Sequence, residues 1–145
     1  MNRRRPAGQT LVETVLVLAI AAFFVQAGVF SWKQLVPKYR LQSAVWQVRT
    51  CLNQARFKSA WSGKTVRVRF IPGGYRLETY EDETKSWILD RAGSVEGAEI
   101  QANNSPTFTP QGTVANLASI TVANVRGTYK ITVAISGRIK AVKTG

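Results

Sequence analysis

The first strong pattern in the chain is an apolar run from Leu11 to Phe30, which is broken only by Glu13, Thr14 and Gln26. At a rise of about 1.5 Å per residue, about 20 helical residues match the roughly 30 Å hydrocarbon core of a bilayer. The basic residues that precede the run favour an N-terminus that stays in the cytoplasm. The run therefore predicts one transmembrane helix, with the rest of the chain across the membrane.

A secretory signal peptide is the alternative interpretation of this N-terminus. The chain has a basic start at Arg3–Arg5, an apolar stretch, and small residues around Val25-Gln26-Ala27, where a signal peptidase could cut. Two features disfavour a signal peptide. The run is longer than the usual apolar region of about 7–15 residues, and a carboxylate at Glu13 is costly inside such a region.

A second helical pattern follows the apolar run. Apolar residues recur at intervals of three and four positions, as one helix face requires, at Leu41, Ala44, Val45, Val48, Leu52 and Ala55. This amphipathic helix should end near Ser62-Gly63 and pack its apolar face on a sheet, with Trp46 and Trp61 as packing residues or as contacts to neighbouring subunits. Pro37 lies between the two helical halves, and its missing N–H predicts a kink or an interruption there.

From Thr65 onward the hydrophobic period changes to two. Val66, Val68 and Phe70 alternate with polar residues, and the pattern resumes after Pro72-Gly73-Gly74, which predicts a hairpin. Further strands are expected at Trp87–Leu89, Val95–Gln101, Ile120–Ala123, Tyr129–Ile135 and Arg138–Val142, with a tight turn at Ser136-Gly137. The expected fold class is α+β: a long N-terminal helix, transmembrane and then amphipathic, packed on a mostly antiparallel β-sheet head.

The residue inventory disfavours catalysis. The chain has no histidine, which removes the usual nucleophile arrangements and the commonest transition-metal ligand. Cys51 is the only cysteine and is expected to be a small core residue. Glu81-Asp82-Glu83 lacks the alternating ligand spacing of a calcium loop and is expected to be a solvated turn. We therefore expect no enzyme, no cofactor, no metal site and no small-molecule substrate.

The charge is strongly basic and unevenly distributed. The formal net charge is +12, and no acid occurs between Glu13 and Glu78 or after Glu99. The cations that follow the last acid are Arg126, Lys130, Arg138, Lys140 and Lys143. Such a surface attracts phosphate groups, so these residues are candidate nucleic-acid contacts. Anionic lipid headgroups or an acidic partner subunit are the alternatives.

The segment Gly8-Gln9-Thr10-Leu11-Val12-Glu13 resembles the type III signal of type IV prepilins, with a glycine before the cut and a glutamate as the fifth mature residue. The resemblance implies that prepilin peptidase cuts after Gly8 and methylates Gln9, where the family usually has phenylalanine. It also implies three parts: a cleaved basic leader (1–8), a transmembrane and assembly helix (9–36) and a globular head (37–145).

Glu13 is the expected assembly residue. Cleavage after Gly8 would create an α-amino group four residues before Glu13, with both groups in apolar surroundings. A buried unpaired carboxylate costs several kcal/mol, and pairing with the amino group of a neighbouring subunit would offset that cost and set the axial register. The alternative is a polar residue that is merely tolerated near the membrane edge.

The C-terminal half carries a second resemblance. Phe108-Thr109-Pro110-Gln111-Gly112, then a strand, then Ser136-Gly137-Arg138 and a final basic strand are similar to the pattern of the GspH/FimT family. The family implies a minor pseudopilin of type II secretion or a minor pilin of a type IV pilus. It also implies an inner-membrane protein with a periplasmic head, and other pilin or pseudopilin subunits as partners. Some FimT-type pilins carry a basic G-R-x-R that is similar to Gly137-Arg138-Ile139-Lys140, which makes DNA uptake the alternative function.

Overall fold

The computed structural model describes residues 11–145, which form two compact units. The first unit extends through Val36 and the second spans Pro37–Gly145. Each unit is described by itself below. The first is a stretch of helix, and the second is the globular head.

A single helical element, α1, extends over Leu11–Ser62 and continues through Pro37. The expectation that the proline would interrupt the helix was therefore wrong, while the expected kink stays a prediction. Proline removes one backbone donor, whereas helix propagation is cooperative and the many remaining hydrogen bonds of a long helix are retained. In the head, the Pro37 carbonyl also accepts a hydrogen bond of 2.8 Å from the Asn124 Nδ2 atom.

The helix ends where the sequence predicted. Gly63 has a φ of +67°, and its N–H donates to the Ser59 carbonyl at 3.1 Å, as in a left-handed C-cap. Ser59 is fully buried, and its Oγ atom lies 2.9 Å from both the Lys64 and the Phe108 carbonyl oxygens. One buried hydroxyl thus fixes the helix end against a strand far away in the sequence.

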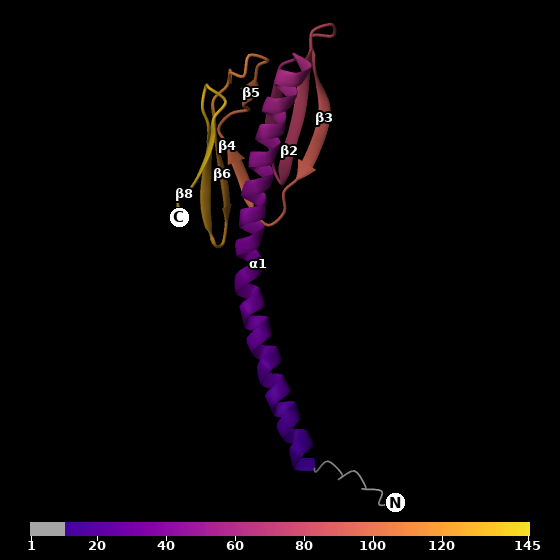
Figure 1. The fold of residues 1–145 in the computed structure, drawn as a ribbon, viewed down its shortest axis with the longest axis vertical. Helices are drawn as coiled ribbons and strands as arrows, with labels where there is room; N and C mark the ends of the chain where they lie inside the picture. Colours follow the sequence, from indigo (N-terminus) through magenta and orange to yellow (C-terminus); the bar gives the residue numbers. More distant parts are fainter. Residues whose placement is uncertain (1–10) are drawn as a thin grey trace, which may run out of the picture. The chain divides into compact units, whose positions relative to one another are not determined.

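The head contains two four-stranded antiparallel sheets rather than one. Sheet A has the order β3-β2-β1-β5 and consists of β1 (Val66–Ile71), β2 (Gly74–Glu81), β3 (Ser86–Ser94) and β5 (Thr107–Phe108). Sheet B has the order β4-β6-β7-β8 and consists of β4 (Glu99–Ala102), β6 (Ala118–Asn124), β7 (Gly127–Val133) and β8 (Ile139–Lys143). In Figure 1, β2 and β3 of sheet A are drawn on one side of the helical half that belongs to the head, and β4, β6 and β8 of sheet B on the other.

Most strands follow the predicted alternation. The β1–β2 hairpin is confirmed, and β6, β7 and β8 occur within two residues of their expected bounds. Strand β3 is longer than the predicted Trp87–Leu89, and β4 begins at Glu99 rather than Val95. Strand β5 was missed because its two residues are held by pairing with β1 and not by a local pattern.

One hydrophobic core joins the helix to both sheets. All six residues of the predicted apolar helix face are buried, which confirms that face. They pack with residues of sheet A and sheet B and with Cys51 in one cluster, whose largest fully buried members include Leu52, Phe108, Ile120 and Ile131. The prediction of Cys51 as a core residue is confirmed.

Candidate functional site

The N-terminal half of α1 presents a long apolar surface to the surroundings. Leu11–Val29 is a 19-residue segment with a mean hydropathy of 2.1 and none of its length buried, so by length and composition it is able to cross a membrane. Glu13 lies on this exposed segment, in the first turn of the helix. The predicted processing residues Gly8 and Gln9 lie outside the described residues.

The head half of α1 exposes a stripe of aromatic side chains opposite the core, here termed the aromatic face. It consists of Tyr39, Trp46, Phe57 and Trp61, which are 64%, 66%, 70% and 83% exposed. Their spacings of seven, eleven and four residues are close to whole helical turns, so the four rings point the same way. The rings of Phe57 and Trp61 stack at a centroid distance of 6.3 Å and an interplanar angle of 14°.

The aromatic face corrects one expectation. Trp46 and Trp61 were predicted to pack in the head or to contact neighbouring subunits, and their exposure makes the first alternative wrong. Because large aromatic side chains left exposed along one side of a helix often mark an interaction site, the face is a candidate contact surface.

Two of the predicted nucleic-acid contacts share the outer face of sheet B. Thr132 pairs with Lys140 and Lys130 pairs with Val142, whereas the intervening Ile131 is buried. Because side chains alternate across a strand, Lys130 and Lys140 project together on the face opposite Ile131. Both lysines are exposed.

The other three cations lie at the two ends of that sheet. Arg126 lies in the β6–β7 turn, and Lys143 pairs with Tyr129 near the same end, on the opposite face from Lys130. Arg138 immediately precedes β8, at the far end of the seven-residue strand β7. At about 3.3 Å per residue this separates the two ends by roughly 20 Å. The five predicted residues therefore do not form one cluster.

Arg56 of the helix joins Arg138 and was not predicted as part of this surface. A Cβ atom at Gly137 would lie 3.0 Å from the Arg56 Nε atom, so the arginine side chain lies against the β7–β8 turn. Gly137 has a φ of +74° and is buried, which explains why glycine is suited to this turn. Nothing local in the sequence connects Arg56 to a turn 80 residues later.

Three acids of the head form ion pairs away from sheet B. Within residues 11–145, the ion pairs join Lys58 to Asp90 and Lys64 to Glu81 at 2.6 Å each, and Arg67 to Glu78 at 2.5 Å. All three acids belong to β2 and β3 of sheet A. The cations of sheet B thus have no ion-pair partner in the described part of the chain, and their charge is available to an external anion.

The thiol of Cys51 has the properties of a packed core group. Burial raises its pKa to about 12, an effect that the nearby charge of Arg91 partly opposes. A thiol with so high a pKa is a poor nucleophile at neutral pH. Among the described residues, no group of histidine, cysteine, aspartate and glutamate side chains is arranged to hold a metal ion.

Comparisons with known proteins identify the fold. No protein-family model and no curated protein sequence matches the chain. Two crystal structures of the type IV minor pilin FimU of Pseudomonas aeruginosa match it with TM-scores of 0.58 and 0.61, each at 16% identity. These matches cover 70% and 72% of this chain and 91% and 90% of the FimU chains.

The minor pseudopilin EpsH from the type 2 secretion system of Vibrio cholerae matches with a TM-score of 0.58 and 13% identity, over 71% of this chain and 95% of EpsH. Identities this low bear on architecture rather than on activity. The head described above, with an amphipathic helix packed on antiparallel sheets, is the architecture that these structures share with it. The chain therefore has the pilin-like fold of minor pilins and minor pseudopilins.

Proposed function

We propose that the chain is a minor pilin or pseudopilin, a subunit of a type IV pilus or of a type II secretion pseudopilus. Prepilin peptidase would cut it after Gly8, and residues 9–36 would hold it in the inner membrane until it is assembled into the filament or at its tip. The observation that carries this proposal is the combination of a pilin-like fold with an exposed apolar segment of 19 residues at the start of α1.

Glu13 has the chemistry for subunit assembly. It lies at the start of an apolar helix, where water is scarce both in a membrane and in a bundle of such helices. A carboxylate in those surroundings is favourable only when it is paired, and the α-amino group created by cleavage would be the matching charge on the next subunit. The pair would fix the axial position of one subunit relative to its neighbour.

The aromatic face supports the same role. Four large rings exposed along one side of the head helix are costly in water, and burial against another subunit would remove this cost. We therefore infer that the aromatic face contacts a neighbouring subunit of the filament.

The proposal is tested by replacing Glu13 with Gln, which removes the charge at almost constant volume. The variant is expected to insert into the membrane as the parent chain does and to be absent from sheared filaments, because the axial ion pair is lost. Gln26→Ala, which replaces another polar residue of the same segment, is the control, and this variant should be incorporated into filaments. Normal incorporation of Glu13→Gln would contradict the assembly role.

DNA binding during uptake is a second candidate function, favoured by the unpaired cations of sheet B. Arg138 with Arg56, the lysine pair Lys130 and Lys140, and Arg126 in the β6–β7 turn extend over roughly 20 Å, whereas Lys143 lies on the other face of the sheet. A DNA strand places a phosphate about every 3.4 Å along the helix axis, so this spread matches several phosphates in succession. The attraction would be independent of base sequence.

The matched comparison for DNA binding uses two double variants in the full-length chain in nonionic detergent. Arg138→Ala/Lys140→Ala removes two charges from sheet B, whereas Arg69→Ala/Arg76→Ala removes two exposed charges from a cross-strand pair of sheet A. Fluorescence anisotropy with duplex DNA at increasing salt should show the slope of log K against log salt reduced by about 2 only in the first variant, since each phosphate contact contributes about 0.9. Equal slopes in both variants would refute DNA binding at this site, and equal loss of binding to anionic vesicles would identify a lipid surface instead.

A further inference from the structure

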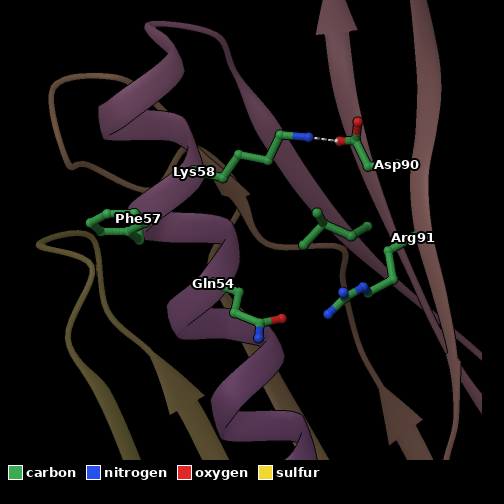
Figure 2. A pocket seen from close by; sticks show the side chains of 6 residues that line it. Gln54, Phe57, Lys58, Asp90 and Arg91 are labelled. Atoms are coloured by element: carbon green, nitrogen blue, oxygen red, sulfur yellow. Dashed lines mark ion pairs between the residues drawn. The ribbon is translucent and has the colours of Figure 1, made fainter.

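A hollow of about 280 Å³ lies between the last turns of α1 and strands β2 and β3. The residues that line it are Gln54, Phe57, Lys58, Leu77, Asp90 and Arg91. Figure 2 shows Gln54 and Lys58 projecting from the helix towards Arg91 and Asp90 on β3. The hollow is distinct from the basic residues of sheet B.

A β-bulge builds the polar wall of this hollow. Leu77 pairs with Arg91 and Glu78 pairs with Leu89, so Asp90 is an extra residue in β3. In a regular strand, consecutive side chains point to opposite faces, and a bulge changes this alternation. As a result, Asp90 reaches Lys58 of the helix while the neighbouring Arg91 also faces the hollow.

The charges of the hollow are not balanced. Asp90 is neutralised by Lys58 at 2.6 Å and accepts a hydrogen bond from the Thr79 hydroxyl. Within residues 11–145, Arg91 forms no ion pair and no side-chain hydrogen bond. In Figure 2 its guanidinium and the Gln54 amide point towards each other across the hollow. The end of the hollow next to Gln54 is therefore a positively charged site with several free donors.

The hollow borders a free strand edge. Strand β3 is the terminal strand of sheet A, and its nine residues are largely exposed because the helix does not cover them. Ile88 is one such residue, opposite the buried Thr79 on the face towards the helix. A terminal strand offers backbone donors and acceptors to an added extended segment.

We propose that this hollow binds the carboxylate side chain of an acidic segment from a partner protein, which lies extended along the free edge of β3. Arg91 provides a two-point hydrogen bond to the carboxylate, and the Gln54 amide donates a further one. Leu77 and Ile88 contact apolar residues that flank the acid. A small free anion would meet a single partly hydrated arginine, which is a weak contact, so the peptide backbone is needed for affinity.

The test uses the full-length chain in nonionic detergent and fluorescent peptides with blocked ends. One peptide alternates valine and threonine around a central glutamate, and the second has glutamine in place of that glutamate. The parent chain should bind the glutamate peptide at least about tenfold more tightly than the glutamine peptide, as expected for charge-assisted hydrogen bonds. Arg91→Gln should remove this preference, and Arg91→Lys should retain only part of it, because lysine lacks the planar fork.

Arg69→Gln is the matched control, since it removes the same charge from an exposed position of β1 outside the hollow. Retention of the glutamate preference in Arg69→Gln, with its loss in Arg91→Gln, supports the proposal. Equal binding of both peptides, equal effects of both substitutions, or no peptide binding would overturn it. Glutarate that competed as tightly as the peptide would also overturn it, because the segment along β3 would then be unnecessary.

Discussion

The aromatic face allows a quantitative prediction about assembly. Trp46→Ser/Trp61→Ser removes two rings that are 66% and 83% exposed. An aromatic side chain presents roughly 200 Å² of surface, so each of these rings exposes about 150 Å². At about 25 cal/mol per Å², burial of one such ring against a neighbour contributes up to about 4 kcal/mol to association. Loss of both should therefore prevent stable incorporation into a filament.

The same substitution should leave the folded head almost unchanged. Neither ring belongs to the core, and surface substitutions of this kind usually change the free energy of unfolding by no more than about 0.5 kcal/mol. The assay compares thermal unfolding of the chain in detergent with its recovery in sheared filaments. Val125→Ser is the control, because Val125 is even more exposed than the two rings and lies in the β6–β7 turn, away from the helix. A lowered unfolding temperature, or normal incorporation, would refute the contact role.

Three further predictions concern the head itself. Cys51 should resist alkylation at pH 8, because burial raises the pKa of its thiol from 9.0 to about 12. The thiol of the unfolded chain therefore loses its proton at a lower pH than that of the folded chain, and the free energy of unfolding should fall above pH 9 by about 1.4 kcal/mol per pH unit. Alkaline unfolding of the parent chain and of Cys51→Ala will test this, since the variant should lack this part of the decrease. Ser59→Ala should lower the free energy of unfolding in denaturant by about 1–3 kcal/mol, since a buried carbonyl loses its donor; an unchanged midpoint would contradict this. Arg67→Met should lower the unfolding temperature more than Lys64→Met, because it leaves the buried Glu78 carboxylate without its ion-pair partner, whereas the Glu81 carboxylate is more exposed to water. The reverse order in thermal scans would count against this explanation.

The sequence predicted the features that depend on local periodicity. The three- and four-residue spacing identified the helix face that packs in the core, and the alternation from Val66 identified the first hairpin. The glycine after Ser62 marked the helix end. These patterns are reliable because one face of each element must be buried, and burial imposes the period of the element on the sequence.

Features that depend on tertiary placement were not predictable in this way. Strand β5 is two residues long and exists through its pairing with β1. Trp46 belongs to a helix face that the head leaves uncovered, and no local pattern distinguishes a covered face from an uncovered one. Arg126 and Arg138 are close in sequence but lie at opposite ends of β7, whereas Arg56 and Gly137 are distant in sequence and adjacent in space.

The bulge at Asp90 illustrates the same limit for the proposed acidic-segment site. Strict alternation would place Asp90 and Arg91 on opposite faces of β3, and only the register shift against β2 brings both to the hollow. Neither neighbour of Asp90 is a glycine or a proline that would mark the extra residue, since Asp90 lies between Leu89 and Arg91. The hollow was therefore visible only in the folded head.

The intact mass of the chain recovered from sheared filaments of its own host tests the central claim most directly. The account predicts a filament-associated chain that begins at Gln9, with or without one added methyl group, because cleavage after Gly8 frees the amino group that pairs with Glu13. A mature chain that begins at Gly28 would instead show a secreted protein cut by signal peptidase. That result, or the absence of the chain from filaments, would contradict the assignment as a pilin-type subunit.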